Sequence, residues 1–407
     1  MPLCRICKNE LQRVLSLGEM PLSNSYLRQE QLGQAEKYYP LDLYFCPQCF
    51  LVQLEEVVPA QDIFSDYAYF SSYSESWLNH CREYVQNIIP RLGLDNGSQV
   101  IEIASNDGGL LQFFKEKNIP ILGIEPAANV ARAARNSGIP TREMFFGIDA
   151  ARLLAEEGLY ADLLIGNNVL AHVPALNSFV AGLKIILKPR GVITLEFPHL
   201  QRLIEGAQYD TIYHEHFSYF SFFTAEKLLA AHRLTVFDVE ELPTHGGSLR
   251  IYARHREDNS RSITSRVKAL REKEKSACLN NIEQFASFAK RIEILKNRVL
   301  SFLNHAQEKG KIVAAYGAPA KANTLLNYCG ISPALISFTV DRNPFKQGLF
   351  LPGSHIPIKA PEFIKIVRPD YIIILPWNLR EEITRQLEFI REWNGRFVTF
   401  IPEIKVF

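Results

Sequence analysis

Residues 100–110 read Val100-Ile101-Glu102-Ile103-Ala104-Ser105-Asn106-Asp107-Gly108-Gly109-Leu110. This run is typical of a buried strand, a tight turn of small residues and the start of a helix. The first strand of a doubly wound sheet delivers such a turn to the carboxyl edge, where ligands bind, and glycines let the backbone approach a ligand closely. The stretch therefore predicts an α/β fold with a cofactor site on this turn.

A second strand with an acidic end follows at Ile121-Leu122-Gly123-Ile124-Glu125-Pro126, where Glu125 lies 18 residues after Asp107. An acid at this place binds ribose hydroxyls in dinucleotide-binding folds. The fourth strand and its loop, residues 163–173, add polar side chains at the same edge. The predicted cofactor-binding residues are Glu102, Ala104, Asn106, Asp107, Gly108, Glu125, Pro126, Asn167 and Asn168.

The turn also indicates which cofactor it binds. A nicotinamide dinucleotide is the usual partner of a strand, a glycine turn and a distal acid, but the turn lacks G-x-G-x-x-G. Glu102 and Asp107 would repel a pyrophosphate and would suit a cationic cofactor without phosphate. S-adenosylmethionine is such a cofactor. The ends of the fourth and fifth strands carry His172, Glu196 and His199 toward the same edge.

Residues 209–219, Tyr209-Asp210-Thr211-Ile212-Tyr213-His214-Glu215-His216-Phe217-Ser218-Tyr219, concentrate histidines, acids and tyrosines in an otherwise apolar run. A histidine beside a carboxylate can act as a general base near neutral pH, so a proton could be taken from carbon here. Two alternatives stay open. In the first, the histidines only satisfy hydrogen bonds in an aromatic core. In the second, His214 and His216 share a face of an extended run and ligate zinc.

Four of the seven cysteines form two CxxC pairs, Cys4/Cys7 and Cys46/Cys49. Four thiolates on two such knuckles make a tetrahedral zinc site without an open position. We therefore predict a structural zinc site that folds the N-terminal module and performs no chemistry. Residues 39–45 between the knuckles alternate in a way that predicts a strand.

The last third contains another strand, turn and helix at residues 311–324, and this turn carries a lysine where the first carried acids. Its backbone amides and Lys321 could meet a diphosphate at the helix N-terminus. Residues 338–341 and 371–377 look like further parallel strands, which predicts a Rossmann-like C-terminal domain. The charged, helical residues 261–309 are predicted to be solvated connecting helices.

Length and composition limit the possibilities further. A chain of 407 residues predicts two or three domains. Lys plus Arg number 45 and Asp plus Glu 44, so charge gives no argument for nucleic acid or an anionic membrane as a partner. The sequence contains no apolar run of the roughly 18 residues that a membrane helix needs and no hydrophobic signal region at its start. We expect a cytoplasmic protein that acts on a small molecule.

These motifs together resemble the nucleotide-sugar C-3 methyltransferases of deoxysugar biosynthesis. The resemblance spans the whole chain and rests on the two CxxC pairs and on four runs: Glu102–Gly108, Glu196–His199, Tyr213–Ser218 and Tyr316–Lys321. It implies a small N-terminal zinc-binding domain, a central Rossmann-like methyltransferase domain that uses S-adenosylmethionine, and a Rossmann-like C-terminal domain. The implied substrate is a nucleotide-linked 4-keto-6-deoxy sugar, methylated at C-3. Ala104 stands where the family's usual turn has its first glycine.

The resemblance also implies site residues. His216 would be the general base, and Tyr213, Glu215, His172 and either Tyr67 or Tyr69 would complete the pocket, with His214 a further candidate. The substrate-binding candidates are His199, Tyr316, Lys321 and Asn323, and the metal ligands are Cys4, Cys7, Cys46 and Cys49.

We accordingly expect a zinc-binding domain at residues 1–73, a methyltransferase domain at 74–255, and a helical linker with the C-terminal domain at 256–407. The expected reaction is methyl transfer to C-3 of a dTDP- or GDP-linked 4-keto-6-deoxy sugar through an enolate, in a monomer or small homo-oligomer. An NAD-type sugar oxidoreductase and a zinc-knuckle binding protein with a degenerate enzyme domain remain alternatives.

Overall fold

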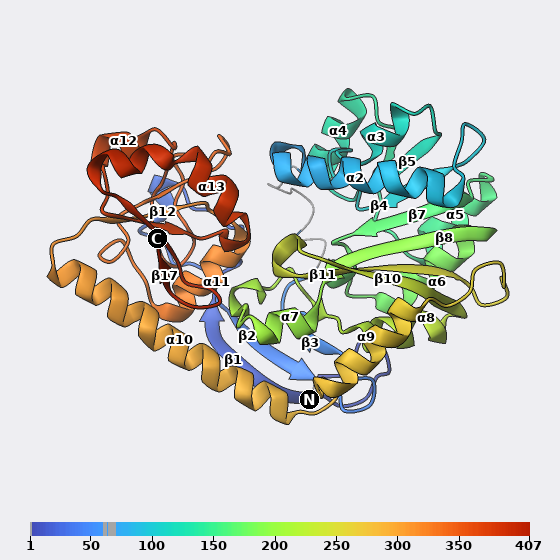
Figure 1. Cartoon of the computed structure of the whole chain (residues 1–407), viewed down its shortest axis with the longest axis horizontal. Helices are drawn as coiled ribbons and strands as arrows, with labels where there is room; N and C mark the ends of the chain where they lie inside the picture. The colour runs from blue at the N-terminus through green and yellow to red at the C-terminus, as the bar shows by residue number, and fades with distance from the viewer. Residues whose placement is uncertain (1, 60–62, 64–70) are drawn as a thin grey trace.

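The computed structural model describes residues 2–59, 63 and 71–407. Within these residues the strands form sheets of four, seven and six strands. In Figure 1 the seven-stranded sheet lies in the cyan and green part and the six-stranded sheet in the orange and red part, while strands β1 and β2, in blue, lie below and between them. This arrangement confirms the predicted α/β fold class.

The central sheet has the strand order β10-β11-β8-β7-β4-β5-β6. Strand β4 (Val100–Ile103) is the one predicted from the first motif, and it pairs in parallel with a neighbour on each side. Alternate side chains of a strand point to opposite faces. Val100 therefore packs in the apolar cluster below α2 and α3, whereas Ile101 and Ile103 pack in the cluster with the residues of α5, α6 and α8.

The other strands of this sheet are β5 (Ile121–Ile124), β6 (Thr141–Arg142), β7 (Ala161–Asn167), β8 (Leu187–Pro198), β10 (Leu234–Leu242) and β11 (Ser248–His255). The helices around it are α2 (Glu75–Leu92), α3 (Leu111–Lys115), α4 (Ala128–Asn136), α5 (Ile148–Glu156), α6 (Leu176–Ile186), α7 (Leu200–Glu205) and α8 (Phe222–Ala231). Four 3-10 turns join them, namely η2 (Ser71–Tyr73), η3 (Leu170–His172), η4 (Tyr209–Thr211) and η5 (Thr244–Gly246).

The six-stranded sheet has the order β14-β13-β12-β15-β16-β17, and all its neighbours are parallel except β16 and β17. The three strands predicted in this region are present as β12 (Val313–Tyr316), β13 (Thr339–Val340) and β15 (Tyr371–Ile374). The remaining strands are β14 (Ile358–Lys359), β16 (Arg396–Thr399) and β17 (Lys405–Val406). The helices are α11 (Ala320–Cys329), α12 (Phe363–Val367) and α13 (Arg380–Gln386), with 3-10 turns η6 (Trp377–Leu379) and η7 (Glu388–Trp393).

The N-terminal sheet contains β1 (Gln12–Met20), β2 (Tyr39–Phe45), β3 (Val52–Leu54) and β9 (Ser218–Tyr219), and the 3-10 turn η1 (Gln29–Gln31) lies between β1 and β2. Strand β2 has the bounds that the sequence predicted. Strand β9 comes from the histidine-rich run and pairs antiparallel with β3. The zinc module and the predicted catalytic run thus share one sheet.

Helices α9 (Ser265–Ser276) and α10 (Glu283–Glu308) were expected to be solvated, and that expectation is wrong for one face of each. Along α10 an apolar stripe recurs every three or four residues and is buried: Phe285, Phe288, Ile292, Leu295, Val299, Leu303 and Ala306. This stripe packs in one core with β1, β2 and the C-terminal sheet, and Figure 1 shows α10 passing below them. The many charges on the other faces concealed the stripe.

The part of the chain that the structure describes contains no helix long and apolar enough to cross a membrane.

Candidate active site

A cavity of about 650 Å³ lies where the central sheet, the histidine-rich run and the C-terminal sheet meet. The turn after β4 and the ends of β5 and β7 line one part of it. Tyr213, Glu215 and His216 line a second part, and Tyr316, Gly317 and Lys321 a third. A cofactor and a substrate bound here would therefore contact elements that are distant in the sequence.

The turn after β4 has a backbone suited to a ligand cradle. Ala104 and Asn106 adopt φ of 56° and 50°, in the left-handed region that side chains disfavour by about 1–2 kcal/mol each. Glu125 holds the turn in place, because its two carboxylate oxygens accept hydrogen bonds of 2.9 Å from the backbone N–H groups of Asn106 and Ala127. Strain of this kind is found where a turn is shaped for binding.

The charge around this turn suits a cationic ligand. Burial, together with the negative charges of Glu125 and Asp107, raises the pKa of Glu102 well above its usual range. Oε2 of Glu102 and both polar side-chain atoms of Asn167 are buried without a hydrogen-bond partner among the described residues. Buried polar atoms without partners are rare, so these atoms favour a polar ligand here. Their chemistry fits S-adenosylmethionine, whose sulfonium and ammonium groups are positive.

Two predicted cofactor residues have other roles. Asp107 accepts hydrogen bonds from the hydroxyls of Ser71 at 2.6 Å and Ser72 at 2.5 Å, so it holds the segment that leads into α2. Gly108 has a φ of 82°, and a Cβ there would meet Ile139 at 2.7 Å. Neither residue lines the cavity, whereas Pro126 and Asn168 do.

In the histidine-rich run Tyr213 and His216 form a hydrogen-bonded pair. Nδ1 of His216 donates to the carbonyl of Thr211 at 2.9 Å, so Nε2 is the acceptor and receives the phenol proton of Tyr213 at 2.7 Å. Burial above all, and after it the proximity of His172, His245 and Lys321, holds the pKa of His216 well below 6.5. The imidazole is thus neutral and lines the cavity with a proton-accepting nitrogen.

His172 lies against this pair. Its ring centroid is 4.8 Å from that of His216, and its Nδ1 donates to the carbonyl of Glu215 at 2.8 Å. Burial lowers the pKa of His172 to about 4, so this ring is neutral as well. The carboxylate of Glu215 accepts a hydrogen bond of 2.5 Å from Asn24 of the N-terminal module. The structure therefore brings together Tyr213, Glu215, His216 and His172.

Three other predicted site residues do not line the cavity. His214 turns away, and its Nε2 donates to the carbonyl of Pro40 at 3.2 Å. His199 is 1% exposed and forms a 2.6 Å contact with the carboxylate of Glu274, which also accepts from the backbone at the start of α8. Asn323 donates to the carbonyl of Ser23 at 2.5 Å. The substrate roles given to His199 and Asn323 do not agree with these positions, because both side chains are buried in structural contacts.

Tyr67 and Tyr69 lie outside the described residues.

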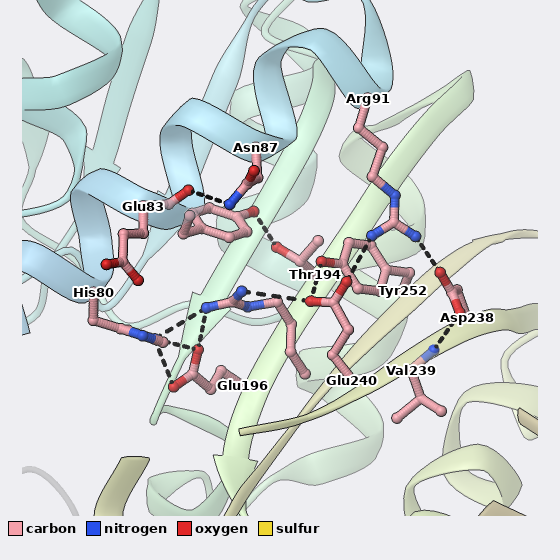
Figure 2. A network of polar contacts seen from close by, with 12 residues as sticks. His80, Glu83, Asn87, Arg91, Thr194, Glu196, Asp238, Val239, Glu240 and Tyr252 are labelled. Atoms are coloured by element: carbon pink, nitrogen blue, oxygen red, sulfur yellow. Dashed lines mark hydrogen bonds and ion pairs between the residues drawn. The ribbon is translucent and has the colours of Figure 1, made fainter. Parts of the chain in front are cut away.

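Glu196, at the end of β8, was expected beside the cofactor but is enclosed in a network of its own (Figure 2). Both its oxygens lie within 3.0 Å of Nε2 of His80, and it also accepts from Thr244 at 3.0 Å and Arg250 at 2.6 Å. Burial alone would raise the pKa of Glu196, but the bond to His80 and the charge of Arg250 outweigh burial and lower it to about 2. Glu196 is a fixed carboxylate that joins α2 to β8 and β11.

The sequence reasoning missed several residues of the cavity: Asn24, Trp77, His245, Arg342 and Lys346. Lys346 donates to the carbonyl of Ala318 at 2.8 Å, and its ammonium lies 5.0 Å from the ring centre of Tyr26. His245 follows Pro243 in a turn, and burial lowers its pKa to about 4. No local pattern marks these residues, because only the tertiary fold brings α2, the turn η5 and the loops that carry the others to the cavity.

The four predicted zinc ligands form one cluster. The sulfur atoms of Cys4, Cys7, Cys46 and Cys49 all lie within 4.8 Å of one another, and no other group of three or more potential ligands occurs in residues 2–59, 63 and 71–407. Four thiols at this spacing fit a tetrahedral zinc ion. Within the described residues no third potential ligand lies close to both His214 and His216, so the structure does not support the alternative zinc site there.

Comparison with known proteins agrees with this organisation. Residues 4–64 match a family model described as a zinc binding domain, residues 77–239 a methyltransferase domain, and residues 243–402 a C-methyltransferase C-terminal domain. The C-methyltransferase NovU of Streptomyces niveus is 34% identical over 404 residues, which are 99% of this chain and 96% of that protein.

Solved structures with a similar fold match less than half of the chain. The PH0226 protein of Pyrococcus horikoshii is 15% identical, with a TM-score of 0.38, and covers 48% of this chain and 97% of its own. The magnesium protoporphyrin IX methyltransferase of Synechocystis is 14% identical, with a TM-score of 0.35, and covers 44% of this chain and 83% of its own.

The predicted cofactors, S-adenosylmethionine in the central domain and zinc in the N-terminal module, are confirmed by the family matches and the cysteine cluster. The full-length match at 34% identity decides the family. This chain belongs to the S-adenosylmethionine-dependent C-methyltransferases, which combine a zinc binding domain, a methyltransferase domain and a C-terminal domain.

Proposed function

We propose that this C-methyltransferase methylates C-3 of a dTDP- or GDP-linked 4-keto-6-deoxy sugar and that His216 removes the C-3 proton. The observation that carries the proposal is the state of His216, a neutral imidazole with its accepting Nε2 in the cavity. A methyl group can be transferred to carbon only where that carbon can become nucleophilic. A ketone at C-4 makes C-3 nucleophilic, because removal of the C-3 proton leaves an enolate.

The residues of the cavity suit this step. The bonds of His216 to Thr211 and Tyr213 orient the base before the sugar binds. The phenol of Tyr213, which donates to Nε2 at 2.7 Å, would give way to the substrate C–H group when the sugar binds. Its low pKa keeps Nε2 unprotonated near neutral pH. S-adenosylmethionine, when bound, supplies the electrophilic methyl group.

The C-terminal domain is proposed to hold the nucleotide. Its parallel sheet presents the end of β12 to the same cavity, and the cations Arg342 and Lys346 line this part. Cations suit a diphosphate. The family decides against an NAD-type oxidoreductase, and the complete set of cavity residues does not favour a degenerate binding protein.

The test follows the C-3 hydrogen directly. Wild-type enzyme with S-adenosylhomocysteine in D₂O should exchange the C-3 hydrogen of the keto sugar for deuterium, and His216→Asn should lower both exchange and methylation about 10²–10⁴-fold. His214→Asn is the matched variant, since His214 lies outside the cavity. Equal exchange by His216→Asn and the wild type would show that another residue is the base. Absence of exchange by the wild type on every keto sugar offered would overturn the substrate proposal.

A further inference from the structure

An enolate needs a hydrogen-bond donor or a cation at its oxygen as well as a base at its carbon. In the histidine-rich site the available hydrogen-bond donors are neutral groups, and in the free enzyme they already have acceptors. The proton of Tyr213 points to His216, and the Nδ1 proton of His172 points to the carbonyl of Glu215. His172 is neutral at ordinary pH, so its other nitrogen is an acceptor. Among the described residues, the positive charge must come from outside this run.

Lys321 is placed to supply it. It lies in the first turn of α11 and lines the cavity. One turn later, the hydroxyl of Thr324 donates to the carbonyl of Ile212 at 2.8 Å, which fixes the start of α11 against the residue before Tyr213. The charge of Lys321 contributes to the lowered pKa values of both His216 and His245, so both rings are within its electrostatic reach.

The surroundings of Lys321 hold its ammonium in one position. Nζ donates to Oδ1 of Asn378 at 2.5 Å and lies 4.5 Å from the ring centre of Trp377. The indole N–H of Trp377 in turn donates to Asp210 at 2.7 Å. Burial lowers the pKa of Lys321, and the negative charge of Asp210, which is 1% exposed, opposes this effect. Asp210 precedes the base by six residues, so this chain of contacts joins the lysine to the same run.

We propose that Lys321 is a catalytic residue whose ammonium stabilises the enolate oxygen at C-4. The inference rests on the proposed keto-sugar substrate. When the C-3–H bond breaks, the proton goes to Nε2 of His216, its electron pair forms the C-3–C-4 double bond, and the carbonyl π pair moves to the oxygen. Lys321 donates a hydrogen bond to that oxygen. In the next step the electron pair on oxygen re-forms the C-4 carbonyl. The pair of the C-3–C-4 double bond forms the new bond from C-3 to the methyl carbon, and the methyl–sulfur bond breaks with its electrons on sulfur.

This role differs from the diphosphate contact expected from the sequence. The negative charge of buried Asp210 acts on Lys321 and would repel a diphosphate with its several negative charges. A lysine in these surroundings is better suited to a charge that appears only in the transition state. Arg342 and Lys346 line the cavity and remain as cations for the diphosphate.

The test separates the two roles. Lys321→Met removes the charge but keeps the length of the side chain. We expect kcat for methylation and the rate of C-3 exchange with S-adenosylhomocysteine to fall about 10²–10³-fold. The affinity for dTDP or GDP alone, measured by calorimetry, should stay within about threefold of wild type. Lys290→Met, on the exposed face of α10, controls for the loss of one lysine.

Two further variants distinguish catalysis from folding. Lys321→Ala leaves space for an amine, so added ethylamine should restore part of the exchange rate, which a purely structural role would not allow. Lys321→Gln keeps a hydrogen-bond donor without the charge, so its exchange rate should lie between those of Lys321→Met and the wild type. Exchange that persists in Lys321→Met, or a loss of nucleotide affinity with unchanged kcat, would overturn the proposal. Absence of exchange in the wild type would count against the substrate instead.

Discussion

The side-chain amide of Asn24 donates a hydrogen bond of 2.5 Å to Oε1 of Glu215, and this contact joins the zinc module to the proposed catalytic run. Asn24 lies in the segment between β1 and β2 and lines the cavity. Nearby, Tyr26 donates to the carbonyl of Ala318 at 2.7 Å. The segment therefore contacts both other domains, and the zinc module supplies part of the cavity wall.

Replacement of Asn24 by Ala should lower kcat without unfolding the protein. The bond is made to a carboxylate, and its loss costs on the order of 1.5–3 kcal/mol, which corresponds to about 10- to 150-fold. Asn24→Asp should lower kcat further, because a second carboxylate would face Glu215. Gln34→Ala, an exposed amide in the same module, is the control. Wild-type turnover in Asn24→Ala would show that Glu215 needs no such support.

The zinc site should therefore affect catalysis through structure alone. We expect one zinc per chain by elemental analysis, and Cys46→Ser should lose both the metal and activity, since the segment that carries Asn24 lies between the two knuckles. Cys278→Ser, at an exposed cysteine outside the cluster, should keep both. An active Cys46→Ser enzyme without zinc would contradict this coupling.

The sequence was sufficient where a structure depends on neighbouring residues. The strand and turn of residues 100–110, strand β2 and the two CxxC knuckles are local patterns, and the structure has all of them. Strand β9 shows the limit, since two residues of the histidine-rich run give no signal that they will pair with β3. Asn24 and Lys346 reach the cavity only through such distant contacts, and Trp377 and Asn378 reach Lys321 in the same way.

A polar residue at a strand end was also an ambiguous signal. Glu196 lies near the end of β8 and His199 directly after it, as the pattern required. Each side chain contacts a buried group that can carry the opposite charge, Arg250 and Glu274 respectively. Sequence alone did not identify these partners, because each lies more than 50 residues further along the chain.

Glu125 should matter for donor binding in two ways. The sequence predicts that it accepts the ribose hydroxyls, and in the structure its contacts to the backbone of Asn106 and Ala127 keep the strained turn in shape. Glu125→Ala should weaken S-adenosylhomocysteine binding about tenfold or more by calorimetry, as expected for loss of a charged hydrogen bond. Glu143→Ala, at an exposed acid beyond β6, is the control. Unchanged affinity in Glu125→Ala would show that the ribose binds elsewhere.

The pH dependence of catalysis should reveal the environment of His216. A base works only when unprotonated, so activity is lost as pH falls through its pKa. Burial, the neighbouring His172, His245 and the charge of Lys321 all lower this pKa. The acid limb of kcat/KM should therefore lie well below pH 6.5, the usual value for histidine. Lys321→Met removes one of these positive charges, so the acid limb of kcat/KM for this variant should move upward toward pH 6.5.

An NMR titration of the His216 ring protons in the free enzyme measures the same pKa independently of turnover, and it should shift upward in Lys321→Met as well. An acid limb at or above pH 6.5 in the wild type would contradict the assignment of His216 as a buried neutral base, and an unshifted limb in Lys321→Met would show that the two groups are not coupled.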